Sequence, residues 1–131
     1  MLRQTQYGGS VATLLLGVGA DPQQAAKARA EGADLIDVRG ATRGALAAIR
    51  ASLPAGVLWT DQRTDPLDAD ELAAKAGVAG CAAVIATAAV CTWLGAPVVR
   101  SRHTRAVRRS IDMTASIAGH RPPSHAVRGL A

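Results

Sequence analysis

The sequence predicts an α/β fold in which short parallel strands alternate with helices. Four short apolar runs are the expected strands: Thr13–Gly17, Ala33–Val38, Val57–Thr60 and Pro97–Arg100. None of them alternates apolar with polar residues, which is typical of strands covered by helices. The segments between them are long enough for helices, and a strand, a helix and a second strand form a right-handed crossover between parallel strands.

The first strand–helix unit carries clear capping signals. A polar arm over residues 1–10 precedes it, and we expect this arm to be flexible. Asp21 is a good N-cap for a helix over Pro22–Glu31, proline suits the first helical position, and a glycine follows the last one. Arg3 before the apolar run Val11–Gly19 also fits a targeting segment. We assign the run to the first strand, because it is short and the helix start follows at once.

The second and third strands each end beside polar residues. Asp37 lies near the end of Ala33–Val38, and a helix with one apolar stripe is expected over Thr42–Leu53. The third strand, Val57–Thr60, leads into a polar loop over Asp61–Leu67. Both strands therefore bring polar side chains to the same edge of the sheet.

Two helices are predicted before the last strand. Asp68 and Glu71 form a D-x-x-E capping pair for a helix that ends at Ala76. The stretch Val78–Leu94 admits a short strand at Val84–Ala86, but its length and alanine content favour a helix.

The last helix, expected over Arg105–Ala118, is amphipathic. Its inward face is formed by Val107, Ile111 and Ile117, and its arginines, Arg108 among them, point outward.

Length and composition fit one globular domain, which we place at residues 11–118, followed by a basic tail over 119–131 that we expect to be flexible. Aromatic residues are only 2% of the chain, which argues against single-stranded nucleic-acid binding on aromatic platforms. No apolar stretch reaches the roughly 18 residues of a membrane-spanning helix.

Cys81 and Cys91 lie in apolar surroundings without metal-ligand spacing. We expect both to be buried thiols in a reducing compartment, the cytoplasm.

The positive charge of the chain is concentrated near its C-terminal end. Residues 97–131 hold seven arginines and one aspartate, whereas residues 1–96 hold eight basic and nine acidic side chains. We expect an anionic partner, since such a field steers anions toward it. The alternative is a solvated run of charge without a partner.

Ligands of parallel α/β sheets bind at the carboxyl ends of the strands, and six charged or titratable candidates follow those ends. They are Asp37, Arg43, Asp61, Arg100, Arg102 and His103. Arginines gathered at one rim suit a small anionic ligand. The sequence contains no glycine-rich phosphate loop, Ser–His–Asp pattern or metal-ligand cluster.

The turn after the last strand is the sharpest candidate. Arg105, Arg108 and Arg109 stand in the first turns of a helix, where positive charge opposes the helix dipole by about 0.3–1 kcal/mol each. That placement becomes favourable if an anion binds the free N–H groups at the helix start. Thr104 is expected to cap this helix when no anion is bound. The alternative is that these arginines point into solvent at small cost.

Two segments resemble the dihydropteroate synthase family. The run GADLIDVRGATRGA at residues 32–45 is similar to the family's GADIIDVGGESTRPGA. The run ATAAVCTWLGAPVVRSRHTRAVRRSIDM at residues 86–113 is similar to the family's last helix–strand–helix unit, which contains an RVHDV motif. The third strand with Asp61 resembles the family strand whose aspartate lies near the pterin. By this match Arg100 aligns with the family's anion-binding arginine, whereas Arg102 and His103 stand where the family has histidine and aspartate.

The resemblance implies a fold and a function. The family is an eight-fold β/α barrel of about 250 residues. Its members condense a pterin pyrophosphate with p-aminobenzoate, and magnesium helps to hold the pyrophosphate. This chain, about half as long, would form a partial, half-length TIM-barrel-like sheet. It lacks equivalents of the fourth-strand asparagine, the DPGIGF segment and the SRK lysine, so a residual pterin or pyrophosphate site with degenerate catalysis is expected.

Three functions stay open at this point. The chain is a dihydropteroate synthase-like transferase with a residual site, a non-catalytic accessory or regulatory subunit, or an unrelated phosphate-binding α/β protein. A partial barrel leaves strand edges and helix faces uncovered. We therefore expect a homo-oligomer or pairing with a full-length relative.

Overall fold

One parallel sheet organises the chain. The computed structural model describes residues 12–60, 65–78 and 80–120, so the expected arm at 1–10 and nearly all of the expected tail lie outside the described residues. Five strands pair in parallel in the order β3-β2-β1-β5-β4. They are β1 (Leu14–Val18), β2 (Leu35–Asp37), β3 (Leu58–Trp59), β4 (Leu67–Asp68) and β5 (Val98–Ser101).

Helices occupy the segments between the strands, as the sequence predicts. They are α1 (Pro22–Ala30), α2 (Arg43–Ser52), the short 3-10 helix η1 (Ala55–Val57), α3 (Ala69–Lys75), α4 (Cys81–Trp93) and α5 (Thr104–Ile117). The predicted caps of α1 and α3 are confirmed. Asp21 accepts a hydrogen bond from the backbone N–H of Gln24 at 2.8 Å, and Asp68 accepts one from that of Glu71 at 3.0 Å.

The local structure departs from the prediction around β4. Leu67, expected at the end of a polar loop, begins this strand and pairs with Val99 of β5. A strand of two residues carries no apolar run, so the sequence pattern could not reveal it. The segment Val84–Ala86 belongs to α4, in agreement with the helix that length and composition favour.

Three side chains lie differently from the prediction. Cys81 is exposed in the first turn of α4, whereas Cys91 is buried, and burial raises the pKa of the Cys91 thiol. Ile117 is 70% exposed, because it stands in the last turn of α5 beyond the packed part of that helix. Arg108 turns inward and donates to Asp34 at 2.7 Å, since that carboxylate lies within reach beside β1.

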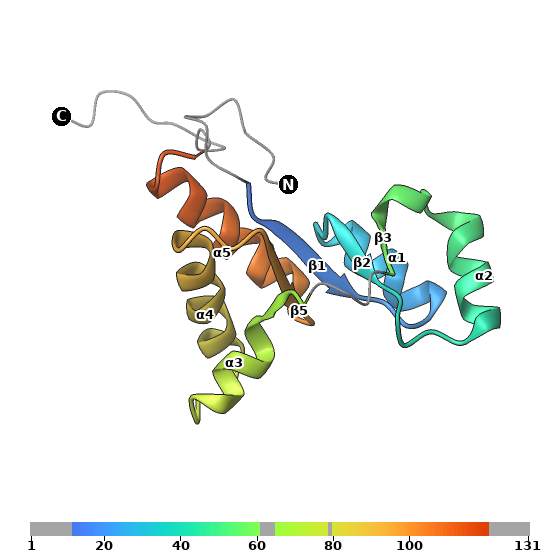
Figure 1. Cartoon of the computed structure of the whole chain (residues 1–131), viewed down its shortest axis with the longest axis horizontal. Helices are drawn as coiled ribbons and strands as arrows, with labels where there is room; N and C mark the ends of the chain where they lie inside the picture. The colour runs from blue at the N-terminus through green and yellow to red at the C-terminus, as the bar shows by residue number, and fades with distance from the viewer. Residues whose placement is uncertain (1–11, 61–64, 79, 121–131) are drawn as a thin grey trace.

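Two hydrophobic clusters lie on one face of the sheet, under the helices. Leu15 is opposite Val99 and Gly17 is opposite Ile36 in the strand register, so these residues point to the same side. One cluster joins Leu15 and Val99 to α3, α4 and α5, and a second joins Ile36 to α1 and α2. Figure 1 shows the same division, with α3, α4 and α5 at the β5 end and α1 and α2 at the β3 end.

Glycine lets α1 approach the end of β1 closely. A Cβ built on Gly19 would lie 2.7 Å from the backbone Cα of Ala25 and 2.7 Å from Cγ2 of Ile36. Real Cβ atoms do not approach other atoms so closely, so a larger residue at this position would push α1 away from the sheet. Glycine here sets the spacing between α1 and the carboxyl edge of the sheet, where the candidate site lies.

Candidate anion-binding site

Asp37 and Arg100 stand on either side of β1 near the carboxyl edge of the sheet. In the strand register Asp37 is opposite Val18, and Arg100 is opposite Leu16. Side chains alternate between the two faces of a strand, so Asp37 and Arg100 share the face opposite the core clusters. Nε of Arg100 donates to Oδ2 of Asp37 at 2.8 Å, which makes an ion pair across β1.

Asp37 is a saturated carboxylate. Arg39 donates to it from Nε at 2.9 Å, from Nη2 at 2.8 Å and from its backbone N–H at 3.1 Å. Burial of Asp37 opposes ionisation, but the hydrogen bonds from Arg39 and Arg100 outweigh it and lower the pKa from 3.8 to about 2. Asp37 is therefore an anion at neutral pH, and it orients two guanidinium groups.

Arg100 also binds a carboxylate on the edge strand β4. Its Nη1 donates to Oδ2 of Asp68 at 2.6 Å, while Oδ1 of Asp68 caps α3. Burial disfavours the charge of Arg100, but the bonds to Asp37 and Asp68 hold its pKa above the ordinary value. Arg100 is thus balanced by two carboxylates and joins β2, β5 and β4.

Asp70, in the first turn of α3, holds the turn between β5 and α5. Its Oδ1 accepts from Oγ of Ser101 at 2.6 Å, and its Oδ2 accepts from the backbone N–H of Arg102 at 2.9 Å. Ser101 is fully buried and accepts in turn from the backbone N–H of His103 at 3.0 Å. These bonds fix the backbone from which the Arg102 side chain projects.

Sequence reasoning missed two of these carboxylates. It assigned Asp68 a capping role alone, and it did not consider Asp70. The sequence did offer a signal in its charges. Acidic residues lie at the start of the helix that follows Asp68, and arginines lie in the turn at residues 100–109. Charge complementarity does not show which segments meet, because the pairing depends on the position of β4 next to β5.

A hollow of about 470 Å³ opens at this edge of the sheet. It is lined by Val18, Ala20, Asp37, Arg39, Gly40, Arg100 and Arg102. Arg39 and Arg100 bind Asp37, and Arg100 also binds Asp68, so two of the three arginines face carboxylates. The guanidinium of Arg102 makes no ion pair with any residue that the structure describes, and Arg102 is exposed. The hollow therefore carries an excess of positive charge at Arg102.

The structure brings three of the six candidates together around this hollow, namely Asp37, Arg100 and Arg102. His103 is the exposed N-cap residue of α5 and lines a separate hollow of about 550 Å³ beside α3. Arg43 is exposed in the first turn of α2 and does not line the 470 Å³ hollow. Asp61 lies outside the described residues.

The start of α5 differs from the prediction. The helix begins at Thr104, and its N-cap is His103, which makes no side-chain capping bond. Thr104 is therefore not the cap, because it already belongs to the first turn. Arg105 and Arg109 are exposed, whereas Arg108 is held by Asp34 and Asp112 away from the helix start.

The carboxylates that the structure describes at this edge do not fit a magnesium ion. Magnesium is bound by free carboxylate and water oxygens. Both oxygens of Asp37 accept from guanidinium groups, and both oxygens of Asp68 accept from Arg100 and the α3 backbone. Within the described ranges no group of three or more His, Cys, Asp or Glu side chains is placed to hold a metal.

Comparisons with known proteins assign no family to the chain. No family model, curated protein or solved structure matches it. In the part of the chain that the structure describes, no helix has the length and apolar character needed to cross a membrane. The charge and geometry of the hollow are thus the observations that bear on function.

Proposed function

We propose that this chain is a dihydropteroate synthase-like protein that binds pyrophosphate, or the pyrophosphate of a pterin, in the 470 Å³ hollow. The observation that carries the proposal is the unbalanced charge of Arg102 beside Arg39 and Arg100. Guanidinium groups bind phosphate oxygens through charge-assisted hydrogen bonds in a fixed fork. Asp37 holds the other two arginines in place and stays ionised.

The strand order supports treating the sheet as part of a barrel. In a closed β/α barrel the first and last strands are neighbours, and the helices ring the outside. Here β1 pairs with both β2 and β5, and the core clusters lie on one face. On this proposal β3 and β4 are the strands at which the ring is open, and the hollow lies at the catalytic rim of the partial barrel.

The charges around the hollow favour binding over catalysis. Arg100 is already balanced by Asp37 and Asp68, and Arg102 and His103 replace the histidine and aspartate of the family's motif. This pattern favours a second candidate, a non-catalytic accessory or regulatory subunit that keeps the scaffold. If the chain is active, its reaction is a transfer of the dihydropteroate synthase type.

Self-association, or pairing with a full-length synthase, belongs to the proposal. Strands β3 and β4 each pair on one side, and several apolar side chains on α4 and α5 are exposed: Val90, Trp93, Leu94, Met113 and Ile117. Uncovered strand edges and apolar surface favour association. Light scattering on the purified chain should give a mass above that of a monomer. A clean monomer that also fails to bind a synthase contradicts this part of the proposal.

A cytoplasmic location is also part of the proposal. Neither Cys81 nor Cys91 forms a disulfide, and free thiols are usual in a reducing compartment. Fractionation of the producing cells tests the location.

Calorimetric titration with pyrophosphate tests the binding site. Arg102→Ala should weaken pyrophosphate binding at least about tenfold, since one charge-assisted bond contributes about 1.5–3 kcal/mol. Arg43→Ala is the matched control, because Arg43 is an exposed arginine outside the hollow, and it should bind like the wild type. Equal affinity of Arg102→Ala and wild type contradicts the site.

Pterin ligands separate the candidate functions. A dihydropteroate synthase-like protein should bind a pterin pyrophosphate more tightly than pyrophosphate alone, whereas an unrelated phosphate-binding protein should not. Formation of pteroate from the pterin pyrophosphate and p-aminobenzoate supports the transferase. Binding without turnover, either alone or with a synthase, supports the accessory subunit.

A further inference from the structure

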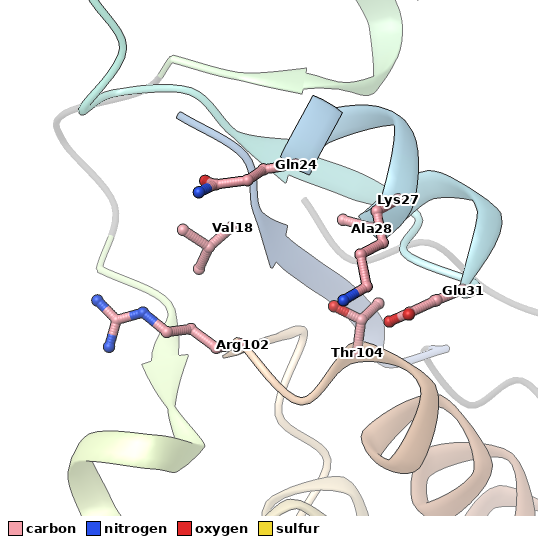
Figure 2. Close-up of a pocket in the computed structure, with 7 residues that line it drawn as sticks. All are labelled: Val18, Gln24, Lys27, Ala28, Glu31, Arg102 and Thr104. Carbon is pink, nitrogen blue, oxygen red and sulfur yellow. The ribbon is translucent and has the colours of Figure 1, made fainter. Parts of the chain in front are cut away.

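A second pocket lies on the helix side of β1, between α1 and the start of α5. It measures about 230 Å³ and is lined by Gln24 and Lys27 of α1, by Glu31 at the C-cap of α1, by Thr104 of α5, and by Val18 and Arg102 among others. Figure 2 shows these side chains around the opening. Val18 and Arg102 also line the 470 Å³ hollow, so the two spaces are neighbours.

Thr104 is a buried residue whose hydroxyl has no hydrogen-bond partner among the described residues. It is 4% exposed, and its hydroxyl makes no hydrogen bond to any residue of the described ranges. The enclosed side-chain polar atoms without a partner in the described ranges are Trp59 Nε1 and Thr92 Oγ1, so the Thr104 hydroxyl is open to the pocket that it lines. The hydroxyl is thus available to a ligand in the pocket.

The backbone at the same place offers further donors. The first N–H groups of a helix have no acceptor within the helix. In α5 the N-cap makes no side-chain bond, and the N–H groups of Thr104, Arg105 and Ala106 have no backbone acceptor in the described part of the chain. The start of α5, a helix of 14 residues, therefore combines these N–H groups with the Thr104 hydroxyl, which faces the pocket.

The charged side chains of the pocket favour an anion. In Figure 2 the Lys27 ammonium and the Thr104 hydroxyl point into the same part of the pocket, with Glu31 beside them and the Arg102 guanidinium at the opposite end. Two positive side chains and one negative side chain leave one positive charge in excess. The partial positive charge of the α5 N-terminus adds to it.

We propose that this pocket is a second oxyanion subsite, which takes a single phosphate group. Thr104 donates through its hydroxyl, the start of α5 donates through its N–H groups, and Lys27 supplies the charge. Glu31 limits the excess charge, which suits one phosphate group rather than a polyphosphate. Lys27 and Thr104 distinguish the subsite from the 470 Å³ hollow, because they do not line the hollow, whereas Val18 and Arg102 line both spaces.

Titration of the full chain with inorganic phosphate and with glycerol 3-phosphate tests the subsite. Calorimetry gives the affinity, and the amide shifts of Arg105 and Ala106 report binding at the start of α5. Lys27→Met keeps the apolar stem and removes the charge, and Thr104→Val keeps the shape and removes the hydroxyl. Each should weaken binding of both probes about tenfold, as expected for one lost charge-assisted bond.

Lys75→Met is the matched control, because Lys75 is an exposed lysine of α3 outside the pocket, and it should bind phosphate like the wild type. Tighter binding of glycerol 3-phosphate than of phosphate assigns the subsite to phosphomonoesters, and the reverse order assigns it to free phosphate. The subsite is overturned if Lys27→Met, which alters only an exposed side chain, binds both probes like the wild type. It is also overturned if the α5 amides do not shift.

Arg39→Ala separates the two spaces. It should weaken pyrophosphate binding in the hollow and leave phosphate binding at α5 unchanged. If Arg39→Ala weakens pyrophosphate binding while Lys27→Met changes nothing, the subsite fails and the proposed function stands. If the effects are reversed, the proposed function fails and the subsite stands.

Discussion

Arg100 donates from Nε to Oδ2 of Asp37 at 2.8 Å, across β1, between residues 63 positions apart in the chain. The same guanidinium reaches Asp68 on β4 at 2.6 Å, so one side chain connects three strands. The pair also determines which arginine is available to a ligand. Because Arg100 is balanced by two carboxylates, the excess charge of the hollow lies on Arg102.

Removal of Arg100 should destabilise the fold. Arg100→Met leaves Asp37 and Asp68 as poorly compensated carboxylates, and we expect the free energy of unfolding to fall by about 2–3 kcal/mol. The loss is smaller than for a fully buried ion pair, because the Arg100 side chain is 18% exposed. Urea denaturation measures it. Arg105→Met, at an exposed position on α5, should change stability by less than about 0.5 kcal/mol, and equal losses would contradict the structural role.

Asp37 should make stability depend on pH in the acid range. Its pKa is about 2 in the folded chain, below the ordinary 3.8. Such a group stabilises the fold above its unfolded pKa, and this stabilisation is lost as the pH falls through the folded pKa. The free energy of unfolding should therefore decrease as the pH is lowered from 3.8 to about 2. Denaturation curves at several pH values should show a smaller decrease for Asp37→Asn, and an identical decrease would contradict this assignment.

Asp70 should position the turn that carries Arg102. Asp70→Ala removes the acceptor of the buried Ser101 hydroxyl, and we expect a loss of about 1–3 kcal/mol in stability, together with weaker pyrophosphate binding. Glu71→Ala is the control, since this neighbouring carboxylate forms an exposed pair with Lys75. Thermal unfolding and calorimetry check both variants. If Asp70→Ala has the same stability and the same pyrophosphate affinity as Glu71→Ala, Asp70 does not position the turn.

Replacing either of two glycines with alanine should change the free energy of unfolding, but in opposite directions. Gly19→Ala places a Cβ against the backbone of Ala25, so we expect destabilisation by about 1–3 kcal/mol. Gly44→Ala adds a methyl group with nothing within 4 Å, inside α2, and should stabilise the chain by about 0.5–1 kcal/mol. Unfolding midpoints measured side by side check the sign. A neutral Gly19→Ala would show that α1 does not approach β1 this closely.

Much of the local structure was predictable from the chain alone. The caps at Asp21 and Asp68 are confirmed, since a cap acts on a backbone N–H three residues away. Strand β4 was not predictable, because its two residues form no apolar run. They are a strand only because they pair with β5. The inward turn of Arg108 was missed for a related reason, since its partner Asp34 lies on another strand–helix unit.

The sequence by itself determined the alternation of strands and helices, because apolar runs, caps and glycines act over a few positions. It also placed the positive charge in the turn after the last strand. Only the tertiary structure decided that Arg100 is bound by Asp37 and Asp68, and that Arg102 carries the excess charge. The physical reason is that these ion pairs join strands that lie far apart in the sequence. Local sequence does not specify that β1 lies between β2 and β5.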